Sequence, residues 1–131
     1  MTTRQRPLSP HLQVYRPVYT MVLSILHRVA GLALSVGLLL LAAWLLALSA
    51  GPRAYARTTG VLDSPPGFVV LAGFAAAFCY HLCAGIRHLI SDTGLGFERA
   101  AARRSAAALV VVALLLALAA LFAMLRIGGS A

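Results

Sequence analysis

The feature that most limits how this chain can fold is a series of three long apolar runs, over residues 29–50, 68–86 and 105–125. The first run holds no ionisable side chain over roughly 22 residues, and about 20 apolar residues suffice to cross a ~30 Å hydrocarbon core. Hydrophobic residues make up 61% of the 131 positions and charged residues only 11%, which is more apolar surface than one small soluble core could bury. The sequence therefore predicts an all-α integral membrane bundle of three transmembrane helices.

Proline and charge divide the chain into an arm, three helices and two connecting segments. We expect a single membrane-anchor domain over residues 1–131, made of a cytoplasmic arm over 1–18 and helices over about 19–50, about 68–90 and about 105–126. Residues 51–67 hold three prolines and three charged residues, a composition that predicts a loop outside the bilayer. A cleaved signal peptide is disfavoured, because its apolar region is typically about 7–15 residues long and begins closer to the N-terminus.

Arginine supplies every positive side chain and predicts the orientation in the membrane. The eleven arginines give a formal net charge of +8 and flank the apolar runs, which disfavours nucleic acid as a partner. Eight of them fall on the side of the N-terminal arm: Arg4, Arg6, Arg16, Arg28, Arg87, Arg99, Arg103 and Arg104. Three fall on the other: Arg53, Arg57 and Arg126. The positive-inside rule then predicts a cytoplasmic N-terminus. The N-terminus does not resemble a transit peptide, which favours a bacterial inner membrane.

One ionisable side chain, His81, lies deeper in its apolar run than any other. It comes roughly five residues before Arg87, hence ~8–10 Å inside the membrane edge at 1.5 Å per residue. Small residues such as Ala77 and Gly85 share or border its helix face, which lets a flat ligand or a second helix approach. A neutral imidazole in such a groove is an axial ligand for low-spin haem iron, whereas an interhelical hydrogen bond is the alternative. Position alone leaves both interpretations open.

A haem held by two imidazoles needs a second axial histidine. His27 and His88 both map to the cytoplasmic rim rather than to the depth of His81. Neither is therefore expected to face His81 across a haem. The sequence predicts that the second ligand belongs to another chain.

Three polar side chains share one face at the start of the first helix. Ser24, His27 and Arg28 stand at positions i, i+3 and i+4. Together they form a compact donor cluster suited to the carbonyl oxygens of a quinone or the propionates of a haem. The alternative is that Arg28 only marks the membrane edge as a snorkelling anchor.

A similar group lies at the inner end of the second span. Arg87 is expected to be a positive-inside anchor. His88 and Asp92, four residues apart, could hydrogen-bond a cofactor or each other. Paired carboxylates, a Gly-rich phosphate loop and Cys/His metal spacing are all missing from the sequence, so we expect no catalytic residue and no self-contained catalytic activity.

Two segments, taken together, resemble the cytochrome b subunit of succinate dehydrogenase, the larger membrane anchor of respiratory complex II. The first is RPLSPHL at residues 6–12 followed by SILHRVAG at 24–31, and the second is YHLCAGIRHL at 80–89 continuing to residue 94. The resemblance covers essentially the whole chain, although the third span matches only as a generic apolar helix. Ala30 and Ser91 depart from the family's usual Ser or Thr and aromatic or Met, which affects only the hydrogen bonding around a quinone and local packing.

The resemblance implies a role for each candidate residue. His81 matches the ligand of the haem b iron, with the second axial histidine supplied by the smaller anchor subunit. Ser24 and Arg28 match ubiquinone-contacting positions, and His27, Arg28 and His88 are candidate contacts for the haem propionates.

The implied function is that of a non-catalytic anchor subunit in a succinate:ubiquinone oxidoreductase, with haem b and ubiquinone as its ligands. The implied partners are the smaller anchor, the iron–sulfur and flavoprotein subunits and the lipid bilayer. Two alternatives stay open: an anchor without haem, in which His81 merely bridges helices, and a fumarate reductase anchor. A small transporter component is disfavoured, because its polar residues would continue through the full membrane depth.

Overall fold

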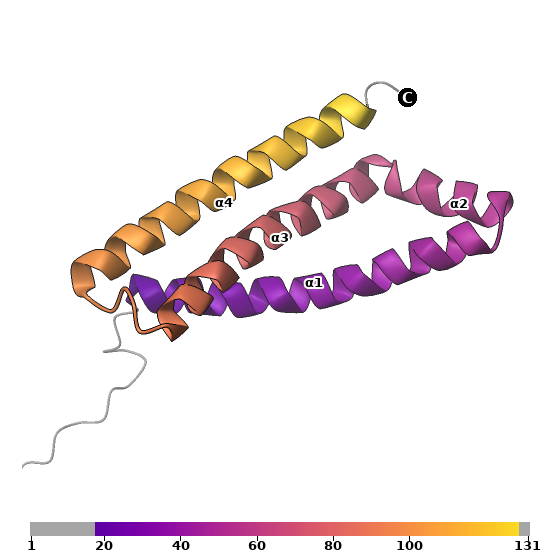
Figure 1. Cartoon of the computed structure of the whole chain (residues 1–131). Coiled ribbons are helices and arrows are strands. Elements are labelled where there is room, and N and C mark those ends of the chain that lie inside the picture. Colours follow the sequence, from indigo (N-terminus) through magenta and orange to yellow (C-terminus); the bar gives the residue numbers. More distant parts are fainter. Residues whose placement is uncertain (1–17, 129–131) are drawn as a thin grey trace, which may run out of the picture.

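Four helices make up the part of the chain that the structure, a computed structural model, describes, namely residues 18–128. They are α1 (Tyr19–Ser49), α2 (Pro52–Leu62), α3 (Pro65–Asp92) and α4 (Arg99–Gly128), and no strand occurs among these residues (Figure 1). Helices α1, α3 and α4 are each long and apolar enough to cross a membrane. The predicted all-α fold with three membrane spans is therefore confirmed. The arginines and the RPLSPHL segment of the N-terminal arm lie outside the described residues.

The three long helices extend beyond the apolar runs from which they were predicted. Helix α1 has 31 residues, about 46 Å at 1.5 Å per residue, whereas the hydrocarbon core is only ~30 Å thick. Helix α4 already begins at Arg99, before the expected start near residue 105. Hydrophobicity indicates which residues face lipid, but the helical backbone continues into the polar layers. The polar side chains at these ends are consequently carried on rigid helix.

The predicted loop over residues 51–67 is wrong for most of its length, since α2 occupies residues 52–62. Pro52 is in the first turn of α2, where its missing N–H costs no helical hydrogen bond, and Gly51 precedes it with φ 103°. Pro65 and Pro66 stand in the first turn of α3 in the same way, after the cap residue Ser64. The prolines that suggested a loop therefore mark helix starts.

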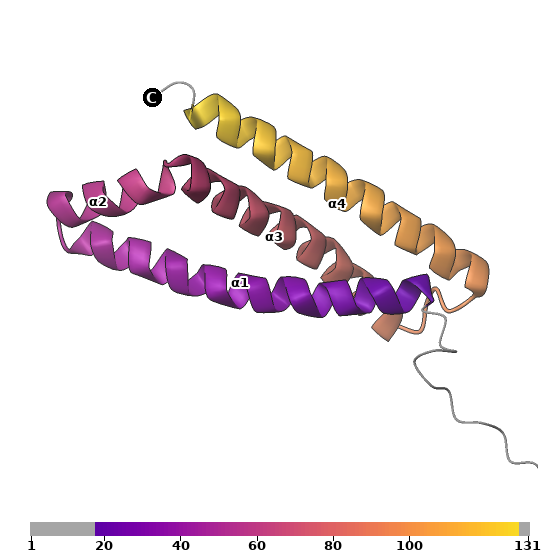
Figure 2. The ribbon, with the colours of Figure 1, turned by 180° about the vertical axis from the view of Figure 1, so that it is seen from behind.

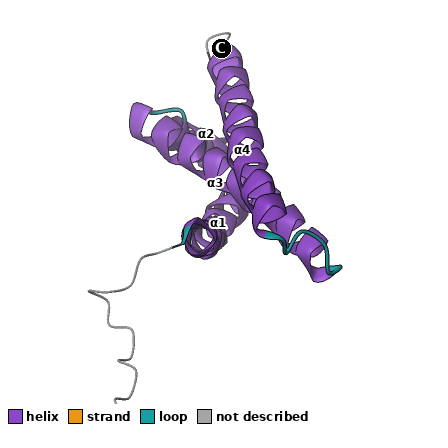
Figure 3. Ribbon diagram, turned by 90° about the vertical axis from the view of Figure 1, so that its left-hand side faces the viewer, coloured by secondary structure: helices purple, strands orange, loops and turns teal. Residues whose placement is uncertain are grey.

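Helix α3 is the centre of the arrangement and packs against both α1 and α4, which hardly touch each other (Figures 2 and 3). The buried hydrophobic residues are few and mostly small: Ala30, Cys79, Ala84, Ala106, Leu109 and Ala113. Small side chains let helices approach closely in lipid, where burying large apolar groups between helices brings little gain. Most of the large leucine and valine side chains point outward and are exposed. This apolar exterior is what a bilayer or a membrane partner would cover.

Candidate functional site

Three imidazole rings gather where the N-terminal part of α1 meets the C-terminal part of α3. The rings of His27 and His81 stack with their centroids 4.1 Å apart and an interplanar angle of 24°. The ring of His88 tilts against His27 at 5.0 Å and 39°. We call these three residues the imidazole cluster. It brings together side chains that are more than 50 positions apart in the sequence.

The ring of His81 is held by the backbone of α1. Its Nδ1 lies 3.2 Å from the carbonyl oxygen of His27, and because a carbonyl only accepts, the contact requires the proton on Nδ1. The lone pair then lies on Nε2, which is the form in which an imidazole binds a metal. A Cβ placed on Gly31 would lie only 3.0 Å from Cε1 of His81, so glycine at this position lets the ring approach. Next to it, the Tyr80 hydroxyl donates to the Leu23 carbonyl oxygen at 2.8 Å.

The sequence analysis placed His27 at the cytoplasmic rim rather than at the depth of His81, but the structure puts the two rings at the same level. Helix α1 begins at Tyr19, so His27 is roughly 12 Å along the helix and meets His81 directly. Its Nε2 is buried and has no hydrogen-bond partner among the described residues. Because ligand lone pairs lie in the plane of an imidazole, two stacked rings cannot point at one iron from opposite sides. His27 is therefore not placed as a second axial ligand to a metal on His81.

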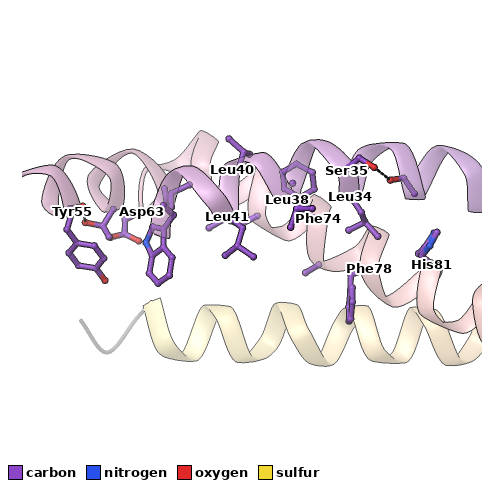
Figure 4. Close-up of a pocket in the computed structure, with 17 residues that line it drawn as sticks. Leu34, Ser35, Leu38, Leu40, Leu41, Tyr55, Asp63, Phe74, Phe78 and His81 are labelled. Carbon is purple, nitrogen blue, oxygen red and sulfur yellow. Dashed lines mark hydrogen bonds between the residues drawn. The ribbon is translucent and has the colours of Figure 1, made fainter. Parts of the chain in front are cut away.

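A large groove of about 1110 Å³ runs from His81 between α1 and α3 towards α2 (Figure 4). Leu34, Leu38 and Leu41 line it from α1, and Phe74 and Phe78 from α3. At its far end the lining changes to Trp44, Tyr55 and Asp63, with the Trp44 and Tyr55 rings 6.0 Å apart. The imidazole of His81 is thus a polar group at one end of an apolar groove.

The arrangement fits the haem that the sequence leads one to expect. His81 presents an anchored imidazole with a free nitrogen, and the groove beside it is apolar and large enough for a flat macrocycle. His27 adds a buried nitrogen that has no hydrogen-bond partner within the described part of the chain. Among residues 18–128, no three His, Cys, Asp or Glu side chains are arranged to hold a bare metal ion.

The polar residues at the start of α1 differ in their surroundings. The ring of His27 turns into the interface with α3, whereas Arg28 is exposed and Ser24 is half-buried. Neither Ser24 nor Arg28 has a hydrogen-bonding partner within the described region, so their donors stay available to a ligand. His88 and Asp92 are both exposed, and no hydrogen bond joins them.

Sequence reasoning missed three residues that shape this end of the molecule. Gly31 has no side chain and so leaves room for the ring of His81. The Ser105 hydroxyl accepts a 3.2 Å hydrogen bond from Nε of Arg87, and the Leu23 carbonyl oxygen accepts one from the Tyr80 hydroxyl. Each acts through a neighbour on another helix. The sequence carries no signal for such pairs, because the helix crossing decides which positions meet.

These features define a class of protein: a three-span helical membrane protein with imidazoles at one end of an apolar groove. The chain belongs to the succinate dehydrogenase/fumarate reductase transmembrane subunit family, whose profile matches residues 2–120.

Individual relatives agree with the family match. The chain is 47% identical over 93 residues to the succinate dehydrogenase cytochrome b556 subunit of Paracoccus denitrificans, covering 71% of this chain and 72% of that protein. It is 43% identical over 94 residues to the subunit of that name from Rickettsia typhi, covering 72% and 73%. The mitochondrial succinate dehydrogenase cytochrome b560 subunit of Homo sapiens is 39% identical over 95 residues, covering 71% of this chain and 56% of that protein.

Proposed function

We propose that the chain is a membrane-anchor subunit of a succinate:ubiquinone oxidoreductase that binds haem b with a partner subunit and forms part of the ubiquinone-reduction site. The names of the relatives support this role, because they are cytochrome b subunits of succinate dehydrogenase. In the complex it would hold the iron–sulfur and flavoprotein subunits at the membrane beside a smaller anchor subunit. Catalysis of succinate oxidation would belong to those partners.

The location follows from the distribution of charge and from the relatives. Of the described arginines, five lie near the end at which α1 begins, namely Arg28, Arg87, Arg99, Arg103 and Arg104. Three lie towards the other end: Arg53, Arg57 and Arg126. With the three spans and the bacterial relatives, this asymmetry supports a multi-pass protein of the bacterial inner membrane with a cytoplasmic N-terminus.

The observation that carries the haem assignment is the anchored imidazole of His81 at the end of the groove. When bound, haem b would supply a one-electron carrier. His81 would hold the iron through Nε2 while its Nδ1–H stays on the His27 carbonyl oxygen, which orients the ring. His27, His88 and Arg28 would offer donors to the propionates.

Ser24 and Arg28 would bind the quinone. Both would donate hydrogen bonds to a quinone carbonyl, and the guanidinium of Arg28 would stabilise the negative charge that develops on that oxygen during reduction. The guanidinium of Arg28 would act as an electrostatic donor and not as a proton source. Protons would therefore come from water at the cytoplasmic end.

The assignment of His81 can be tested by spectroscopy of the purified complex. In the dithionite-reduced minus oxidised spectrum, we expect His81→Ala to lose the b-type band that the wild type shows. His88→Ala is the matched control, because it removes an exposed imidazole of the same cluster that would give up one propionate donor but no iron ligand, so the b-type band should remain. A band retained in His81→Ala would refute the ligand assignment. Loss in both variants, with loss of the partner subunits, would show an assembly role for this face instead.

A further inference from the structure

A second pocket lies on another face of α3, away from the imidazole cluster. It has a volume of about 300 Å³ and is formed between α3 and α4. From α3 it is lined by Cys83, Arg87 and Ile90, and from α4 by Ser105, Ala108 and Val112. Neither the haem nor the quinone assignment uses this space. It combines one charged side chain with a mostly apolar wall.

Arg87 is the polar centre of this pocket and is half-buried. Its Nε donates to the Ser105 hydroxyl at 3.2 Å, which uses one of the five N–H donors of a guanidinium. Within residues 18–128 it has no other hydrogen-bond partner, and no carboxylate lies within ion-pair distance. A half-buried cation in a membrane helix costs free energy unless an anion or acceptors complete its surroundings. The terminal guanidinium nitrogens are therefore available to an anionic ligand.

Arg87 lies near the end of α3 at which the charged side chains of α3 and α4 gather. Helix α3 ends at Asp92, so Arg87 lies roughly 7 Å inside that end at 1.5 Å per residue. Further positive charge lies at the same end on the first turns of α4, at Arg99, Arg103 and Arg104, all exposed. In the other direction the pocket continues onto Leu109 and Val112, which are apolar.

We propose that the pocket between α3 and α4 binds one anionic phospholipid of the cytoplasmic leaflet. The phosphate is held by the guanidinium of Arg87, and the acyl chain lies along Ala108 and Val112. Charge at one end and apolar surface at the other match the two parts of a phospholipid, and basic pockets between membrane helices are typical binding sites for anionic headgroups. A small free anion would leave the apolar wall uncovered.

The test uses the whole purified complex with its partner subunits, stripped of lipid in detergent. Equal amounts of phosphatidylglycerol or phosphatidylcholine are added back, and bound lipids are counted by native mass spectrometry. We expect the wild type to hold one phosphatidylglycerol that Arg87→Gln binds about tenfold more weakly, since a charged hydrogen-bonding pair is lost. Arg126→Gln, which changes an arginine at the opposite end of α4, should bind as the wild type does.

A second variant tests the apolar half of the site. Ala108→Phe fills the pocket from an exposed position and leaves the Arg87–Ser105 hydrogen bond in place. It should also lose the bound phosphatidylglycerol, and it decides the question if Arg87→Gln does not assemble. Unchanged binding in Ala108→Phe, or equal binding of both lipids by the wild type, would overturn the proposal. Loss of a partner subunit from Ala108→Phe would assign this face to a protein contact and would overturn it as well.

Discussion

The two faces of α3 are built differently. Towards α1, polar side chains of α3 reach backbone carbonyl oxygens, with Tyr80 on Leu23 and His81 on His27. Towards α4, the contact rests on buried small and apolar residues of α4, namely Ala106, Leu109 and Ala113. Within the described part of the chain, the polar side-chain contact between α3 and α4 is the hydrogen bond from Arg87 to Ser105. The first face fixes the direction of particular rings, whereas the second brings two helices close together.

This difference suggests that function and packing are divided between the two faces. A hydrogen bond to a carbonyl oxygen specifies one ring orientation, which a metal ligand needs. A seam of small residues gives dispersion contacts and tolerates no added volume, but it does not orient a reactive group. Changes on the α1 side should therefore alter activity or spectrum first. Changes on the α4 side should alter stability first.

The largest effect is expected from Arg28→Leu on α1. We expect quinone reductase activity of the complex to fall by about 10²-fold, because a donor that stabilises developing negative charge is removed. Succinate oxidation with a soluble dye acceptor should stay unchanged, since that chemistry would belong to the partner subunits. Equal loss of both activities would contradict the assignment of Arg28.

A change in the α4 seam should have the opposite pattern. Ala113 is buried, with 6% of its surface exposed, and Ala113→Leu should destabilise the packing by about 1–3 kcal/mol through added volume. The measurement is thermal unfolding of the purified complex, with the haem spectrum recorded alongside. Ala119→Leu, on the exposed side of the same helix, is the matched control and should have little effect. A shifted haem spectrum with unchanged stability in Ala113→Leu would contradict the view that the α4 side of α3 provides packing and the α1 side provides function.

The smallest effect is expected from Gly31→Ala. At Gly31, close packing between α1 and α3 and the orientation of the His81 ring depend on the same residue. The added Cβ would lie 3.0 Å from Cε1 of His81, so the ring must turn away from its rotamer at a cost of about 0.5–1.5 kcal/mol. We expect a changed electron paramagnetic resonance spectrum and midpoint potential of the haem. Gly73→Ala serves as the control, because its Cβ would meet no atom within 4 Å. Identical haem properties in the two variants would show that Gly31 does not position His81.

Some parts of this protein could be predicted from the sequence because they depend on local composition. The three spans follow from apolar runs long enough for a bilayer, and the structure confirms them. The prediction of a loop over residues 51–67 was wrong. Composition alone does not distinguish a proline in the first turn of a helix from a proline in a loop. The sequence analysis expected His27 to be shallower than His81, because hydrophobicity along one helix does not show which positions of two crossing helices meet.

The sequence by itself determined that the chain enters a membrane, how often it crosses and which polar side chains it carries inside. Those properties depend on the transfer of apolar side chains to lipid, and the composition of each segment determines that transfer without reference to the other segments. Tertiary structure alone decided that His27 stacks on His81, that Gly31 makes room for the ring and that Arg87 meets Ser105. Such pairs depend on the crossing of two helices, and small residues at many positions would allow many crossings.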